Sequence, residues 1–198
     1  VCMKQVVEIS TAELNDDYTL DRKRSGVAVN PADCSALEQA LLIKETYGAE
    51  ISVVTMGAKS AEEILKQVAA LDTDRLILIS DESYRGSDTF VTANILKEAI
   101  DFLGPFDLII MGRRAVDGET GHVGPQVAAL LDTPCITNVT EVMIENGKEA
   151  VCERLLEGCR LKLSVPLPAV ITVCGGSNRL RPASIAGYKR AKNACITH

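Results

Sequence analysis

Short apolar runs and amphipathic segments alternate along the first two thirds of the chain. The apolar runs, each of strand length, are Val1–Val7, Ile51–Met56, Arg75–Ile79 and Asp107–Met111. The segments with helical spacing of apolar residues are 30–47, 60–70, 88–103 and 126–131. This β-α-β-α-β-α-β order predicts an α/β fold, a three-layer sandwich in which helices cover both faces of a mostly parallel sheet.

The predicted helices have start and stop signals. Asn30 is a good N-cap, Pro31 suits the first helical position, and Asp33 lies in the first turn, where the helix dipole favours a carboxylate. Gly48 follows as the stop. Ser60 is expected to cap the second helix in the same way.

Beyond residue 134 the pattern changes to short strands joined by tight turns. The expected strands are Val139–Ile144, Gly147–Leu156, Cys159–Val165 and a final apolar run, Ala169–Cys174. They predict an antiparallel extension of the sheet in the last third of the chain. After Gly176 the tail is expected to be irregular. Charged residues between 16 and 24 predict a surface loop or hairpin near the N-terminus.

Charge is distributed unevenly along the chain. The net charge of the 198 residues is −6, which argues against nucleic acid as a general partner. The segment Arg179–Lys192 nevertheless holds five basic residues and no acid. Taken alone, such a segment is more often a solvated tail than a docking surface.

Several functional classes lack their motifs. Only two histidines are present, and none of the seven cysteines forms a C-x-x-C pair, so zinc and iron–sulfur sites have no spacing support. Scattered thiols are typical of an intracellular protein, and we expect a cytoplasmic one. The P-loop, G-x-G-x-x-G and G-x-S-x-G motifs are missing as well. No apolar run approaches the ~18 residues of a membrane helix, and no signal peptide is visible.

One segment, Met111–Pro125, favours a specific chemistry. It reads M-G-R-R-A-V-D-G-E-T-G-H-V-G-P and joins an apolar strand to an amphipathic helix. Its glycines let the backbone approach a ligand closely. Unpaired N–H groups at the start of a helix, together with the helix dipole, favour an anion. Because long loops of this kind are usually functional, we expect a nucleotide phosphate here.

The same residues resemble a known family. V-C-M-K-Q-V at Val1–Val6, N-P-A-D at Asn30–Asp33, V-T-M-G at Val54–Gly57 and the stretch Asp107–Pro125 resemble the β subunit of electron-transfer flavoproteins. The run Arg179–Lys192 is similar to that family's signature near the end of its core domain. The motifs occur in matching order and spacing over nearly the whole chain.

The resemblance implies an electron carrier rather than an enzyme with its own catalytic side chains. It implies an α subunit that carries an electron-shuttling FAD, and partner flavin dehydrogenases of the acyl-CoA or another type. The β subunit binds AMP in most members and a second FAD in the electron-bifurcating ones. The D-G-E-T, V-G-P and N-P-A-D variants are similar to the bifurcating branch, so FAD is expected rather than AMP. The alternative is a non-redox module of the same fold that binds AMP or ATP; a hydrolase lacks any catalytic constellation.

The resemblance also implies site residues. Those expected to bind the cofactor are Cys2, Asn30, Pro31, Ala32, Asp33, Met56, Gly112, Arg113, Arg114, Ala115, Val116, Asp117, Gly118, Glu119, Thr120, Gly121, His122 and Val123. Residues 30–33 are expected at the adenine or ribose and residues 112–123 around the phosphates. Those expected to dock partner dehydrogenases are Ile185, Lys189 and Arg190.

These assignments divide the chain and predict the effects of mutations. Residues 1–176 are expected to form one nucleotide-binding domain, and residues 177–198 a basic partner-docking loop and tail. Family members continue past the position of His198 as an arm that embraces the α subunit. Valine at Gly118 or Gly124 is expected to abolish nucleotide binding with little loss of fold. Ile185→Ala is expected to weaken dehydrogenase coupling alone.

Overall fold

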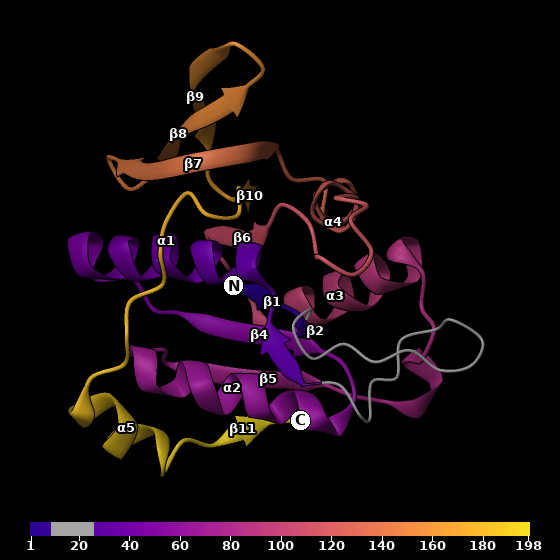
Figure 1. Ribbon diagram of the computed structural model, residues 1–198. Coiled ribbons are helices and arrows are strands. Elements are labelled where there is room, and N and C mark those ends of the chain that lie inside the picture. Colours follow the sequence, from indigo (N-terminus) through magenta and orange to yellow (C-terminus); the bar gives the residue numbers. More distant parts are fainter. Residues whose placement is uncertain (9–25) are drawn as a thin grey trace.

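The computed structural model describes residues 1–8 and 26–198 (Figure 1). The charged segment predicted around residues 16–24 lies outside the described residues. The strands are β1 (Cys2–Met3), β2 (Gln5–Val7), β3 (Val27–Val29), β4 (Ser52–Met56), β5 (Arg75–Ile79), β6 (Leu108–Gly112), β7 (Cys135–Glu145), β8 (Glu149–Leu156), β9 (Cys159–Pro166), β10 (Ala169–Val173) and β11 (Ile196–Thr197). The helices are α1 (Pro31–Tyr47), α2 (Glu62–Val68), α3 (Thr89–Leu103), α4 (Val123–Leu130) and α5 (Ile185–Ala191), with 3₁₀ turns η2 (Lys59–Ala61), η3 (Ala69–Leu71) and η4 (Glu82–Tyr84).

One large sheet joins most of the described strands. Its order is β11-β5-β4-β1-β6-β10-β7-β8-β9. Neighbours from β11 to β7 run parallel, and β8 and β9 add an antiparallel ribbon at one edge. Strands β2 and β3 pair separately as an antiparallel ladder. The predicted α/β sandwich with its antiparallel extension is therefore confirmed.

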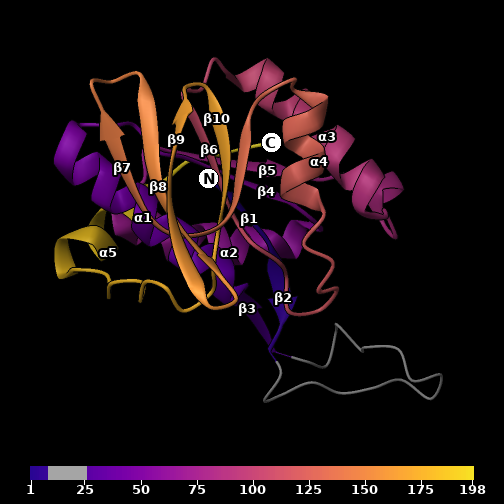
Figure 2. The ribbon, with the colours of Figure 1, turned by 90° about the horizontal axis from the view of Figure 1, so that it is seen from above.

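Helices cover the two faces of the sheet and make two apolar cores (Figure 2). Consecutive residues of β4 enter different cores: Val53 packs with α1 and α2, and Val54 packs with α3 and α4. On α1, Leu37 is fully buried, and burying a side chain of this size contributes about 1.5–3 kcal/mol. This burial fixes α1 against the sheet and so fixes where its N-terminus lies.

Strand β1 marks the point where the strand order reverses. Cys2 pairs with Val54 on one side and with Met111 on the other. From β1 the chain builds outward through β4 and β5, then crosses back to β6 and β10. In open α/β sheets, ligands bind beyond the carboxyl ends of the strands at such a reversal. The carboxyl ends of β1, β4 and β6 therefore define the edge at which a ligand site is expected.

The first predicted strand is divided in two. The run Val1–Val7 breaks at Lys4, so β1 joins the large sheet and β2 pairs with β3 instead. The cause is a contact distant in sequence: the Lys4 peptide N–H donates to the Asp33 carboxylate at 2.7 Å, and the Lys4 carbonyl accepts from the Asn30 N–H at 3.0 Å. These bonds turn the chain at the carboxyl end of β1.

Three further expectations were wrong in detail. Ser60 does not cap the second helix, because it lies inside η2 and its hydroxyl bonds the Gln5 side chain. Helix α4 begins at Val123, earlier than predicted. The basic tail is not irregular: α5 is capped by the Ser184 hydroxyl, and β11 extends the sheet beside β5. The proposed division at residue 176 stays a prediction.

Candidate functional site

The loop between β6 and α4 lies at the carboxyl ends of the strands, at the point where the strand order reverses. Backbone bonds tie its first half to other elements. The Gly112 N–H donates to Asp33 Oδ1 at 3.1 Å, and the Arg113 N–H donates to the Val173 carbonyl at 2.8 Å. The start of the loop is thereby held against the N-terminus of α1 and the end of β10.

Asn30 occupies the N-cap position of α1 but does not cap the helix through its side chain. Its amide instead bridges to the loop: Nδ2 donates to the Arg114 carbonyl at 3.0 Å, and Oδ1 accepts from the Val116 N–H at 3.2 Å. The residue is 1% exposed. Both polar atoms of the Asn30 side chain therefore fix the loop.

Asp33 makes a second bridge from α1. Its carboxylate accepts from the Lys4 N–H and the Gly112 N–H, which lie at the ends of neighbouring strands. Burial raises the pKa of the Asp33 carboxyl to about 7, although hydrogen bonds from Lys4, Asn30 and Gly112 and the nearby Lys4 charge oppose the shift. The carboxylate thus occupies backbone donors that were expected to face a phosphate.

Lys4 also holds the loop in place, and sequence reasoning did not identify it. Its Nζ donates to Asp117 Oδ1 at 2.8 Å, and the same oxygen accepts from the Gly118 N–H at 2.8 Å. The Asp117 side chain is 11% exposed, so this ion pair is partly shielded from water. A lone lysine inside the apolar run Val1–Val7 is the only signal that the sequence offered.

The second half of the loop keeps free donors. Within the described residues, the peptide N–H groups of Thr120, Gly121, His122 and Val123 have no acceptor in the protein. They lie at the N-terminus of α4, where the helix dipole also favours negative charge. Exposed Arg113 is in no ion pair with any described residue, whereas Arg114 lies 3.7 Å from Glu119. This arrangement suits a phosphate.

The glycines of the loop differ in the space around them. A Cβ added at Gly118 meets no atom of the described residues within 4 Å, so this position faces open space beside them. At Gly112 it would lie 2.2 Å from Asp33 Oδ1, and at Gly124 it would lie 2.4 Å from the Cγ2 of buried Thr172. The expectation that valine at Gly124 spares the fold is therefore wrong, because it would push α4 off β10. A substitution at Gly118 can therefore test ligand binding without disturbing the packing of the described residues.

The other predicted cofactor residues lie at the same edge. Cys2 lies on β1, and Met56 ends β4. Pro31 is exposed at the start of α1, and Ala32 is buried against Gly175. The predicted docking residues lie elsewhere, on α5, which packs beside η3. The structure thus brings the first set together and separates it from the second.

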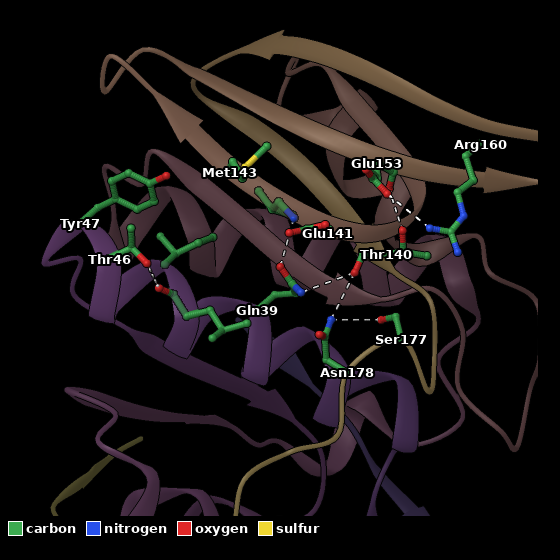
Figure 3. Close-up of a pocket in the computed structure, with 13 residues that line it drawn as sticks. Gln39, Thr46, Tyr47, Thr140, Glu141, Met143, Glu153, Arg160, Ser177 and Asn178 are labelled. Atoms are coloured by element: carbon green, nitrogen blue, oxygen red, sulfur yellow. Dashed lines mark hydrogen bonds and ion pairs between the residues drawn. The ribbon is translucent and has the colours of Figure 1, made fainter.

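Two cavities in the described part of the chain lie away from this loop. The larger, about 700 Å³, opens between α1 and β7 (Figure 3). Its size suits a small ligand. Its amides are nevertheless paired internally: Gln39 Oε1 accepts from the Val142 N–H at 3.1 Å, and Asn178 Nδ2 donates to the Thr140 carbonyl at 3.2 Å. We therefore favour the loop, whose donors are free, as the candidate site.

The smaller cavity, about 370 Å³, lies between β3, the end of α2 and the segment that leads into α5, with Cys34 and Tyr188 among its lining residues. No helix in the described residues has the length and apolarity needed to cross a membrane.

Comparisons with known proteins point to one family. Residues 17–197 match the model of the electron transfer flavoprotein domain. A relative from Anaerotignum propionicum, the acryloyl-CoA reductase electron transfer subunit gamma, is 39% identical over 87% of this chain and 65% of its own length. The electron transfer flavoprotein subunit beta of Thermoanaerobacterium thermosaccharolyticum is 37% identical over 98% of this chain and 74% of its own. The caffeyl-CoA reductase-Etf complex subunit CarD of Acetobacterium woodii is 37% identical over 100% and 76%. The chain thus spans about two thirds to three quarters of these relatives.

Proposed function

The chain belongs to the electron transfer flavoprotein domain family, and on that premise we propose that it is a β-type subunit that binds FAD at the loop between β6 and α4. In this proposal it relays electrons with an α subunit between flavin dehydrogenases and an acceptor in the cytoplasm. The names of the relatives from reductase complexes support partners of the acyl-CoA type.

The observation that carries the proposal is the set of free peptide donors at residues 120–123. A dinucleotide such as FAD has two linked phosphates, each negatively charged. Four unpaired N–H groups at a helix N-terminus, with exposed Arg113 nearby, offer hydrogen bonds and positive potential for this linkage. The open space at Gly118 leaves room beside them. The residues present therefore fit the cofactor.

The chain itself binds and orients. FAD, when bound, supplies the redox chemistry, and the protein contributes position and electrostatics. Asn30 and Asp33 hold the first half of the loop in place, so that less of the loop has to be ordered when the cofactor binds. On α5, Ile185 is 81% exposed and stands beside Lys189 and Arg190, a combination that suits an apolar pocket with an acidic rim on a partner.

Titration with FAD tests the proposal. The purified chain is expected to bind about one FAD, and Gly118→Val is expected to weaken binding at least about tenfold, or ~1.4 kcal/mol, because the new side chain enters the ligand space. Its melting temperature should change by no more than about 2 °C, since the Cβ meets no atom of residues 1–8 or 26–198 within 4 Å.

Ala129→Val, which adds bulk at an exposed position on α4, serves as the matched control and should bind FAD normally. Equal FAD affinity in the wild type and in Gly118→Val would refute the site. Binding of AMP or ATP with no affinity for FAD would instead favour the non-redox alternative.

A further inference from the structure

Asp33 was expected to contact the nucleotide, but its surroundings assign it a different task. The residue is 5% exposed, and its two carboxylate oxygens accept from the Lys4 N–H at 2.7 Å and the Gly112 N–H at 3.1 Å. These partners are protein groups, so the carboxylate connects segments of the protein to one another.

The two backbone partners of Asp33 belong to segments that must stay in register. Lys4 follows β1, and Gly112 ends β6, the neighbouring strand in the sheet. The Lys4 side chain also reaches Asp117 in the loop at 2.8 Å. A change at Asp33 therefore affects the loop at Gly112 directly and at Asp117 through Lys4. We expect a shift of this first half of the loop to move the free donors at residues 120–123 as well.

We propose that Asp33 is a positioning residue whose ionised carboxylate holds the Gly-rich loop in the shape that retains the cofactor, so that cofactor affinity falls when this carboxylate takes up a proton. The inference rests on the proposed function, since it concerns the same site. The protonated acid presents a hydroxyl to one of the two N–H donors, and that hydrogen bond is weakened or lost.

Burial places the titration in an accessible range. The pKa of Asp33 is raised to about 7, chiefly because the charged form is removed from water. The charged and titratable groups that face it are the Lys4 ammonium, the thiols of Cys2 and Cys34, and Asp117 through Lys4. Burial raises the pKa values of both thiols, so these stay neutral near pH 7.

The test is FAD affinity measured between about pH 8 and about pH 6. FAD is a suitable probe because its diphosphate linkage carries no group that titrates in this range. The wild-type affinity is expected to fall roughly threefold to tenfold on acidification, which corresponds to the loss of one net hydrogen bond. Asp33→Asn places an NH₂ group against one of the N–H donors, so its affinity should be lower at about pH 8 and nearly constant down to about pH 6.

His122 is an imidazole in the same loop and needs its own control. His122→Gln, whatever its affinity at about pH 8, should keep the fall seen in the wild type. A second readout is independent of any ligand. Since burial raises the folded-state pKa above the unfolded value of 3.8, the free energy of unfolding of the wild type should decrease as the pH rises from about 4 to about 7. Asp33→Asn should lack this component.

Each outcome has a defined meaning. A wild-type affinity for FAD that does not change with pH, or a fall that Asp33→Asn retains, would overturn the positioning role while leaving the proposed function intact. A chain that binds no FAD at any pH would instead contradict the proposed function. A fall that disappears in His122→Gln and persists in Asp33→Asn would assign the titration to the imidazole and overturn the inference.

Discussion

Replacing Gly112 by alanine is expected to destabilise the chain by about 3 kcal/mol or more and to abolish FAD binding. The added Cβ would lie 2.2 Å from Asp33 Oδ1 and 2.7 Å from the backbone atoms Ala32 C and Asp33 N. These backbone atoms belong to α1, which is fixed by its buried face, so the strand end and the helix must separate. The Asp33 carboxylate then loses a backbone partner.

Thermal unfolding and FAD titration check this prediction. The melting temperature of Gly112→Ala should fall by about 6 °C or more. Gly118→Ala makes the same chemical change in the same loop, but its Cβ meets no atom within 4 Å in the part of the chain that the structure describes. It should melt like the wild type. Similar melting temperatures for the two variants would mean that β6 and α1 are not as closely packed as described.

Replacing Gly187 by alanine is expected to release α5 from the body of the domain. Its Cβ would lie 2.0 Å from the carbonyl oxygen of Ala70 in η3. Alanine within a helix normally stabilises by up to about 1 kcal/mol relative to glycine, so a loss of stability at this position would reverse the usual sign. Because α5 presents Ile185, its displacement should also disturb the proposed docking of a partner.

Hydrogen exchange measures this release directly. Protection of the α5 amides is expected to fall roughly 30-fold in Gly187→Ala, equivalent to about 2 kcal/mol of local stability, while FAD affinity stays unchanged. Ile185→Ala should keep the wild-type protection, because that side chain is 81% exposed. Undiminished protection in Gly187→Ala would show that α5 does not depend on close contact with η3.

The layered architecture was predictable because its signals are local. Apolar runs of strand length alternate with helical periodicity, and Gly48 ends α1 in the left-handed conformation with φ 73°, as its position in the sequence indicates. The carboxyl-edge position of the loop followed from the β-α-β order. These features depend on residues close together in the chain, so a single sequence is enough to identify them.

The hydrogen bonds that connect distant segments at the site were not predictable from local signals. Asn30 and Asp33 fit the ordinary preferences for the start of a helix, yet their side chains bond residues about 80 positions away. A helix start has the same residue pattern whether its side chains cap the helix or reach a distant loop. The break at Lys4 has the same cause, since an apolar run does not reveal which partner strand each residue will find.

The tail was misjudged for a related reason. The interpretation of residues 177–198 relied on their charge, whereas the helix and the strand there depend on a few specific contacts. Ser184 caps α5, Gly187 lets that helix approach η3, and the β-branched pair Ile196–Thr197 adds to the edge of the sheet. A serine followed by a short helical segment was a signal that could have been used.

The central claim is that free peptide donors at residues 120–123 bind the phosphates of a flavin dinucleotide. Amide proton–nitrogen NMR spectra of the isotope-labelled chain, recorded while FAD is added, test it most directly. The largest shifts are expected at Thr120, Gly121, His122 and Val123, with smaller ones at Gly112 and Val116, whose N–H groups are already bonded. Shifts confined to the cavity between α1 and β7, with residues 120–123 unchanged, would contradict the account.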